Sequence, residues 1–211
     1  MEIRESYDAA ARAYAEHLAG ELDGKPLDRH LLNRFAEEMQ GRGTVADLGC
    51  GPGHIARYLH ERGVRVEGID ISPEMIQVAG DLNPGMDFQV GDIQRLDVAD
   101  GSFAGAVLFY SIVHFETSEL ANVFREVRRV LAPGGLALVA FHIGDEAVHL
   151  DDLFGARVYL DFRFFPPSTV IEALKGAGFA VKEHVERKPY EGAEYPSRRC
   201  YLLARSVSGE P

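Results

Sequence analysis

The sequence contains only two cysteines and no long hydrophobic run. Cys50 and Cys200 cannot supply a disulfide framework or a zinc cluster, so we predict no metal site. No apolar segment approaches the roughly 18 consecutive residues that indicate a membrane-spanning helix. Residues 1–20 carry acidic side chains and lack a continuous apolar centre, which argues against a secretory signal. These absences favour a cytoplasmic protein without a membrane partner.

The sequence also has fewer basic residues than acidic residues. Lysine and arginine together number 22, aspartate and glutamate number 33, and the formal net charge is −11. Such a chain repels a phosphate backbone, so we expect no nucleic-acid partner. A cluster of arginines, Arg125, Arg128 and Arg129, is interpreted as the solvated face of a helix near its C-terminal end, where cations are favourable.

The length of 211 residues and the 46% of hydrophobic residues fit a single globular domain, residues 1–211. We find no internal repeat and no low-complexity linker. The pattern divides the domain into an N-terminal helical segment at 1–40 and a regular core at 44–142. An irregular insertion rich in Asp, Phe and Tyr follows at 143–168, and a final helix with two strands occupies 169–206.

Within the core, short apolar runs alternate with helical patterns. Strands are expected at 44–48, 64–72, 86–92, within 105–115 and at 136–142, and helices at 54–62, from Ser72 onward and at 118–131, with a turn at 133–135. The strands are nearly continuous runs of Val, Ile, Leu and Ala, which is typical of a sheet covered on both faces. The alternation therefore predicts an α/β fold with parallel strands.

A glycine-rich loop joins the first expected strand to the helix that follows it. Asp47, Gly49, Gly51 and Gly53 spell D-x-G-x-G-x-G at this junction. Glycine lets the chain turn tightly and lets backbone N–H groups approach a ligand, and the helix directs its positive end to the same place. Cys50, inside the loop, is interpreted as a small side chain that fits a crowded turn. The loop predicts a binding site for a nucleotide-like or anionic ligand.

Two further acids lie at the ends of the next two expected strands. Asp70 lies 21 residues after Gly49, where an α/β nucleotide-binding fold places a carboxylate that accepts hydrogen bonds from ribose hydroxyls. Asp92 follows the third strand and can accept from an exocyclic amine, while Ile93 packs on a purine. Taken alone, each acid is equally explained as a turn residue. Together with Asp47 they mark the carboxyl edge of the sheet, where open α/β sheets bind ligands.

These residues occur in five segments, namely DLGCGPGHIA, GIDIS, VGDI, SFAGAVLFYSIVHF and LAPGGLALVAFH. The combination resembles the class I S-adenosylmethionine-dependent methyltransferases, most closely their small-molecule branch. The resemblance covers residues 44–142 closely and the later strands more loosely. It implies a Rossmann-like three-layer sandwich with a mostly parallel seven-stranded sheet whose last strand is antiparallel. It also implies S-adenosyl-L-methionine as cofactor and S-adenosyl-L-homocysteine as product.

The resemblance also implies roles for individual residues. Asp47 and the loop Gly49–Gly53 would meet the amino-acid portion of the cofactor, and Asp70 would hold the ribose. The other expected cofactor contacts are Ile71 beside adenine, Asp92 and Ile93 at its amine and ring, Tyr110 and Ser111 at the methionyl portion, and Tyr14 as part of a lid formed by the helical segment 1–40. For Tyr14 the alternative is a helix that packs on the sheet by its apolar face.

The acceptor is expected to be a small molecule methylated on O, N, C or S. His114 and His142 follow the fourth and fifth strands and are candidate bases, although either can instead be a histidine bonded to backbone at the sheet edge. Four residues are candidates for the acceptor pocket: Tyr159, Arg163, Phe165 and Tyr195. An equally good interpretation of 157–168 is a strand whose aromatic residues seal the core and whose arginine lies outside.

Other functions are less consistent with the sequence. The third glycine falls four residues after the first, whereas NAD(P) oxidoreductases space them by five. Amino-directed nucleic-acid methyltransferases carry a Pro-Pro-aromatic signature after the fourth strand, where this chain has FYSIVHF. A protein methyltransferase and a non-catalytic cofactor-binding module stay open, and the sequence leaves the oligomeric state undetermined.

Overall fold

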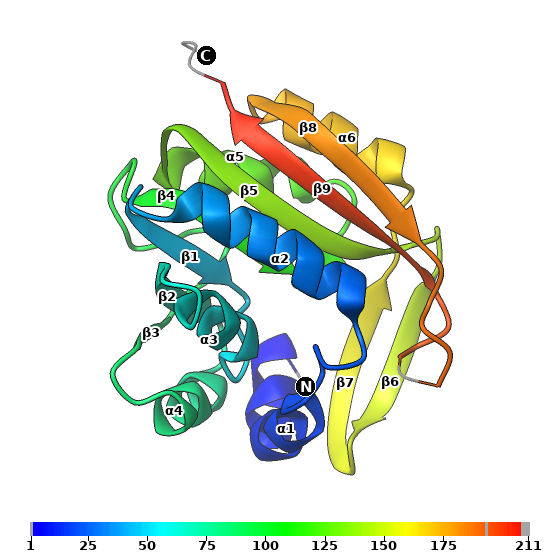
Figure 1. Cartoon of the computed structure of the whole chain (residues 1–211). Coiled ribbons are helices and arrows are strands. Elements are labelled where there is room, and N and C mark those ends of the chain that lie inside the picture. The colour runs from blue at the N-terminus through cyan, green and yellow to red at the C-terminus, as the bar shows by residue number, and fades with distance from the viewer. Residues whose placement is uncertain (1, 193, 208–211) are drawn as a thin grey trace.

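The computed structural model describes residues 2–192 and 194–207 (Figure 1). Its helices are α1 (Ile3–Leu18), α2 (Pro26–Met39), α3 (His54–His60), α4 (Pro73–Leu82), α5 (Leu120–Val130) and α6 (Pro167–Gly176), with a short 3₁₀ helix η1 (Ile112–His114). Its strands are β1 (Thr44–Leu48), β2 (Arg65–Asp70), β3 (Asp87–Val90), β4 (Phe103–Phe109), β5 (Leu131–Ile143), β6 (Ala147–Leu153), β7 (Ala156–Arg163), β8 (Phe179–Arg187) and β9 (Arg198–Ser206). Within these described residues, no helix is long and apolar enough to cross a membrane.

Seven strands form one sheet in the order β3-β2-β1-β4-β5-β9-β8. The pairs β3–β2, β2–β1, β1–β4 and β4–β5 are parallel, whereas β9 runs antiparallel to both of its neighbours, β5 and β8. The mostly parallel seven-stranded sheet with an antiparallel last strand is therefore confirmed. Parallel pairing brings the carboxyl ends of β1, β2, β3 and β4 to one edge of the sheet.

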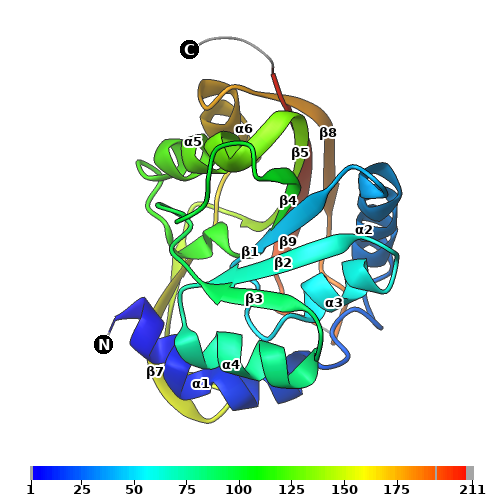
Figure 2. The same ribbon diagram turned by 90° about the vertical axis from the view of Figure 1, so that its left-hand side faces the viewer.

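Helices cover both faces of the sheet, which gives the predicted three layers (Figures 1 and 2). On one face, α2 and α3 bury apolar side chains, among them Leu32, Phe35, Met39, Ile55 and Leu59. On the other face, α5 and α6 bury a second set, among them Leu120, Phe124, Val127, Val170 and Leu174. The apolar stripe of each helix and the continuous apolar strands thus meet in two cores.

Three expectations about the elements need correction. The turn at 133–135 is instead part of β5, where the pairing with β4 shifts between Phe103↔Leu131 and Gly105↔Leu136. A backbone φ of +77° at Gly134 accommodates this irregularity. The insertion at 143–168 contains an ordered hairpin, β6–β7. In the segment 1–40, expected as a whole to form a lid, α2 instead packs on the sheet, whereas α1 contacts α4 and β7.

Helix α1 lies across the carboxyl edge, between α4 and the β6–β7 hairpin (Figure 1). Asp8 accepts hydrogen bonds from the Ser72 hydroxyl at 2.6 Å and from the Glu74 backbone N–H at 3.3 Å, which joins α1 to α4. The Ser6 hydroxyl accepts from the Tyr159 backbone N–H at 3.0 Å, which joins α1 to β7. These contacts hold one face of α1 toward the ends of the parallel strands.

Candidate functional site

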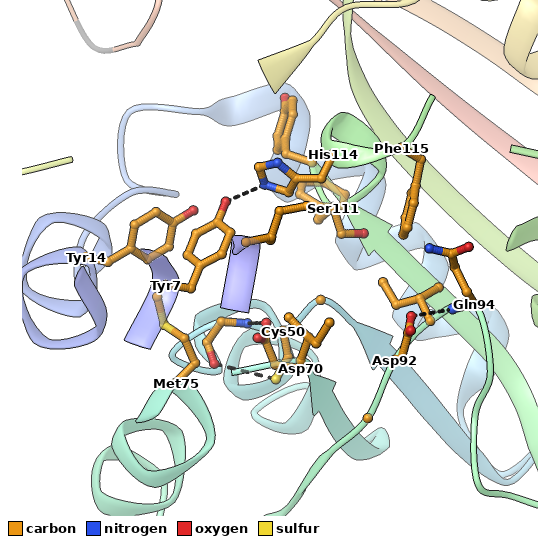
Figure 3. Close-up of a pocket in the computed structure, with 18 of the residues that line it drawn as sticks. Tyr7, Tyr14, Cys50, Asp70, Met75, Asp92, Gln94, Ser111, His114 and Phe115 are labelled. Atoms are coloured by element: carbon orange, nitrogen blue, oxygen red, sulfur yellow. Dashed lines mark hydrogen bonds between the residues drawn. The ribbon is translucent and has the colours of Figure 1, made fainter. Parts of the chain in front are cut away.

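A cavity of about 350 Å³ lies at the carboxyl edge of the parallel strands. We call it the edge cavity; its lining includes Tyr7, Tyr14, Gly49, Asp70, Asp92 and His114. Asp70 and Asp92 lie on one side, and Tyr7 and His114 lie on the other (Figure 3). The cavity thus combines acids from two strand ends with aromatic side chains from α1.

The glycine loop presents bare backbone to the edge cavity. The Gly49 and Cys50 N–H groups both donate to the Ile69 carbonyl, at 2.8 and 3.1 Å, which fixes the turn. Gly49 has a φ of +74°, and a Cβ at this position would lie 2.4 Å from the Cβ of Ser111. Only glycine therefore fits between β1 and Ser111. The buried Ser111 hydroxyl has no hydrogen-bond partner among the described residues.

Two members of the glycine motif lie behind the loop and do not line the edge cavity. A Cβ on Gly53 would lie 2.8 Å from the Phe88 ring, so this glycine permits packing of α3 against β3. Asp47 is 1% exposed, and its Oδ2 has no hydrogen-bond partner within the described chain. Burial raises the pKa of Asp47 to about 7. Asp47 is therefore a buried carboxyl group with one oxygen, Oδ2, that has no hydrogen-bond partner among the described residues.

The two acids at the strand ends differ in environment. Asp70 is buried, and its Oδ2 and Oδ1 accept from the backbone N–H groups of Gly51 and Ser72, each at 2.9 Å. Burial raises its pKa above the usual value. Asp92 is exposed at the rim, where it accepts from the Gln94 backbone N–H at 2.8 Å. The isoleucines that follow these acids also line the cavity: Ile71 and Ile93.

His114 is bonded at both ring nitrogens. Its Nδ1 lies 3.0 Å from the Asp161 carbonyl, which can only accept, so Nδ1 carries the proton. Its Nε2 then accepts from the Tyr7 hydroxyl at 2.6 Å (Figure 3). Burial lowers the pKa of His114 to about 4, so the ring is neutral at ordinary pH. A base role for His114 therefore requires the Tyr7 hydroxyl to relay the proton or to move aside.

A second cavity of about 260 Å³ adjoins the first. We call it the inner cavity; the residues that line both cavities are Tyr7, Tyr14, His54, Phe109 and Tyr110. Two other predicted residues, His142 and Tyr195, line the inner cavity. Tyr110 has a φ of +57°, uncommon for a residue other than glycine, and this backbone places its ring at the junction.

Three residues predicted for the acceptor pocket line neither the edge cavity nor the inner cavity. Tyr159 is 57% exposed, Arg163 pairs with Glu116, which itself lines the edge cavity, and Phe165 is 1% exposed within the core. Side chains alternate between the two faces of a strand, so Tyr159 and Arg163 share the outer face of β7. Phe162, on the inner face of β7, lines the inner cavity.

The sequence did not reveal the charged residues of the inner cavity. Lys25 pairs with Glu21, which is also 2.9 Å from Nε2 of His54. Arg199 Nε lies 3.1 Å from Glu194. These charges sit in loops and at strand ends, where charged residues are ordinarily solvated. No sequence spacing relates residues near position 21 to residues near position 194, so no signal could have found them.

The comparisons agree with this geometry. A family model described as a methyltransferase domain matches residues 45–135. The malonyl-[acyl-carrier protein] O-methyltransferase of Erwinia billingiae is 30% identical over 176 residues, which are 81% of this chain and 66% of that protein. The sterol 24-C-methyltransferase of Gibberella zeae is 28% identical over 194 residues, 85% of this chain and 47% of that protein. The chain thus spans about half to two thirds of the length of these relatives.

A solved structure supports the fold. The SAM-dependent methyltransferase of Methanosarcina mazei superposes with a TM-score of 0.72 over 82% of this chain and 97% of that chain, at 19% identity. This likeness concerns the fold, whereas the curated relatives and the family model concern the sequence as well. The matched residues 45–135 include the glycine loop, Asp70 and Asp92. By sequence and by fold, the chain belongs to the class I S-adenosylmethionine-dependent methyltransferases.

Proposed function

We propose that the protein transfers a methyl group from S-adenosylmethionine to a small-molecule acceptor. The observation that supports this best is the junction of two cavities at the carboxyl edge. The edge cavity has bare backbone at Gly49 and acids at Asp70 and Asp92, and the inner cavity adjoins it across Tyr110. This arrangement can hold a cofactor in one cavity and present its reactive group to a ligand in the other.

The residues of the edge cavity fit the cofactor. Behind the loop and outside the cavity lining, Oδ2 of Asp47 lacks a hydrogen-bond partner, and its charge can stabilise the ammonium group of a methionyl portion held at the loop, because a buried carboxylate is stabilised by a nearby cation. The buried Ser111 hydroxyl, also without a partner in the described chain, can donate to its carboxylate. Asp70 retains lone pairs for ribose hydroxyls, and Ile71 and Ile93 provide apolar surfaces for adenine.

Most of the acceleration would come from orientation. Bound S-adenosylmethionine supplies an electrophilic methyl group on a sulfonium sulfur. Tyr7 and Tyr14 of α1 cover the cavity, exclude water and direct aromatic rings toward a cation, which is favourable for a sulfonium. Well-aligned partners in such sites reach effective molarities of about 10⁵ M or more. The chain thus needs to align the acceptor atom with the bond between the methyl group and the sulfur. It needs to accept a proton only where the acceptor atom carries one.

A small molecule is favoured over a macromolecular acceptor. The inner cavity, at about 260 Å³, takes a ligand smaller than the usual drug-sized range of roughly 300–1,000 Å³. The names of the relatives include a protein-bound malonyl group and a sterol, so they do not fix the acceptor atom. The net charge of −11 disfavours nucleic acid.

Labelled cofactor tests this proposal directly. Incubation of the protein with methyl-labelled S-adenosylmethionine and fractions of a metabolite extract should label one class of small molecule. In parallel, S-adenosylhomocysteine should raise the thermal unfolding midpoint while NAD leaves it unchanged. Stabilisation by NAD alone would contradict the cofactor assignment. Stabilisation by S-adenosylhomocysteine without any labelled product would support a non-catalytic module.

A further inference from the structure

Tyr7 and His114 form a hydrogen-bonded pair beside the junction of the two cavities. Tyr7 lines both the edge cavity and the inner cavity, and His114 lines the edge cavity next to it. Tyr7 therefore lies where a ligand of the inner cavity meets a methyl group presented from the edge cavity. A side chain in this position can contact the acceptor atom itself.

The protons of this pair have defined positions. The Asp161 backbone carbonyl can only accept, so Nδ1 of His114, 3.0 Å away, carries the ring proton. Nε2 therefore holds a lone pair, and the Tyr7 hydroxyl donates its only proton to it at 2.6 Å (Figure 3). The Tyr7 oxygen then has no proton left to donate, and its own lone pairs can accept a hydrogen bond from a ligand. The pair thus presents a hydrogen-bond acceptor to the junction.

Contacts between α1 and β7 hold this pair in place. On α1, the Ser6 hydroxyl accepts from the Tyr159 backbone N–H at 3.0 Å and donates to the Tyr159 carbonyl at 3.3 Å. On β7, Asp161 follows two residues later, and its carboxylate is bonded to His149 at 2.7 Å, which leaves only its carbonyl for His114. These contacts fix the distance between the tyrosine and the histidine before any ligand binds.

The surroundings of the pair suit a proton that comes from a strongly acidic group. Burial lowers the pKa of His114 to about 4, against the opposing effect of the hydrogen bond to Asp161 and with a further lowering by the charge of Arg163. Burial also raises the pKa of Tyr7, so this phenol does not ionise. Tyr7 must therefore accept one proton as it releases another. The imidazole ring takes up a proton readily only from a group that is more acidic than the ring.

A hydroxyl acceptor meets this condition, whereas other acceptors do not. An oxygen that has gained a methyl group while it still bears its proton is an oxonium, which is a strong acid. A methylated amine has a pKa of about 10 and keeps its proton. A carboxylate carries no proton to release. C–H and S–H groups are weak hydrogen-bond donors, so neither engages the Tyr7 oxygen well before the transfer.

We propose that the protein methylates an uncharged alcohol or phenol hydroxyl and that Tyr7 accepts the proton of that hydroxyl. A bond forms between the acceptor oxygen and the methyl carbon, and the carbon–sulfur bond breaks with its electron pair left on sulfur. The hydroxyl proton passes to the Tyr7 oxygen as the Tyr7 proton passes to Nε2 of His114. The products are a methyl ether, S-adenosylhomocysteine and an imidazolium ring, which releases its proton to solvent when the site empties. This assignment rests on the proposed function, because it names the atom that receives the methyl group.

The linkage of the transferred methyl group tests the acceptor class. S-adenosylmethionine with a ¹³C-labelled methyl group is incubated with the full-length protein and metabolite fractions, and the carbon chemical shift of the product reports the atom that bears the methyl group. We expect a methyl ether. A methyl ester, or a product methylated on nitrogen, sulfur or carbon, would overturn the assignment and leave the proposed function standing. Absence of any product would overturn both.

A solvent isotope effect tests the path of the proton. With the fraction that yields the labelled product, single turnovers should be slower in deuterium oxide, because a proton moves during the transfer. Tyr7→Phe and His114→Gln should each lower the rate by about 10²-fold and abolish the isotope effect, while S-adenosylhomocysteine affinity by calorimetry changes little. Tyr159→Phe, at an exposed ring, should alter none of these quantities. An isotope effect that persists in Tyr7→Phe would overturn the role of Tyr7.

Nitrogen NMR of the protein labelled with ¹⁵N-histidine tests the pair without any reaction. The resonances that disappear in His114→Gln should belong to a neutral ring with its proton on Nδ1. Tyr7→Phe should shift the Nε2 resonance, because it removes the donor, and Tyr159→Phe should leave that resonance in place. A proton on Nε2 would reverse the hydrogen bond and make Tyr7 a donor to the ligand. That result would overturn the assignment and leave the proposed function standing.

Discussion

At the scale of the residue, Asp47 is a buried carboxyl group, and its Oδ2 has no hydrogen-bond partner among the described residues. Its pKa in the folded chain is raised to about 7, whereas the value in the unfolded chain is near 3.8. As the pH rises from about 4 to 7, the unfolded chain loses this proton first. The contribution of Asp47 to stability is therefore present at low pH and is lost as the pH rises through 7.

The substitution Asp47→Asn should stabilise the ligand-free protein and weaken cofactor binding. An amide does not ionise, so the unfolding midpoint should rise at pH 8 by several degrees and change little at pH 4. S-adenosylhomocysteine should bind at least tenfold more weakly by calorimetry, because the ammonium partner is lost. Asp87→Asn, on the exposed start of β3, serves as the control. Unchanged affinity in Asp47→Asn would remove Asp47 from the cofactor site.

His114 and Tyr7 form a hydrogen-bonded pair whose contribution can be measured separately from binding. His114→Ala should reduce turnover much more than cofactor affinity, and Tyr7→Phe should do the same because it removes the hydroxyl that His114 contacts. Since the pKa of His114 is about 4, the rate should show no titration of this ring near pH 6.5. Tyr159→Phe, at an exposed ring on β7, is the matched control. Equal losses of turnover and affinity would indicate a structural role for the pair.

The residues that could be found from the sequence differ in kind from those that could not. Asp47, Gly49 and Asp70 follow from local chain order, because a strand, a glycine loop and a strand end have fixed spacing. Lys25 and Arg199 reach the inner cavity through contacts between segments more than 150 residues apart in the chain. Such contacts leave no periodic pattern, so only the folded chain reveals them.

At the scale of the element, α1 is the part of the N-terminal segment that contributes side chains to the edge cavity. It contacts α4 and β7, and its Tyr7 and Tyr14 face the edge cavity. Deletion of residues 1–20 should weaken S-adenosylhomocysteine binding by calorimetry and preserve the circular dichroism of the sheet, because the two cores lie under other helices. Asp8→Ala, which removes the acceptor for Ser72 and Glu74, should produce a milder loss. Undiminished binding after the deletion would exclude α1 as a lid.

The sequence predicts some elements better than others for a physical reason. In 44–142 the strands are buried on both faces, so their apolar runs are unambiguous. The β6–β7 hairpin has one outer face with Tyr159 and Arg163, and its mixed composition hides the strands. Helices α1 and α2 show similar periodicity, which predicts an apolar face but not what covers it. Tertiary contacts direct α2 to the sheet and α1 to the cavity.

At the scale of the whole molecule, the alternation of strands and helices was enough to predict an α/β fold with a parallel sheet. The carboxyl edge collects Asp70 from β2, Asp92 after β3 and Tyr110 after β4 because parallel strands end together. The acceptor pocket depends on the β6–β7 hairpin and the loop before β9, which the regular α/β pattern does not describe. Its chemistry therefore had to be read from the folded chain.

Glu21 contacts one residue at the inner cavity and one residue beside the glycine loop. One of its oxygens pairs with Lys25 at the inner cavity, and the other lies 2.9 Å from His54, which begins the helix after the glycine loop. A ligand that displaces one partner changes the electrostatic environment of the other. Occupancy of the two cavities is then thermodynamically linked, and each ligand alters the affinity for its companion by the same factor.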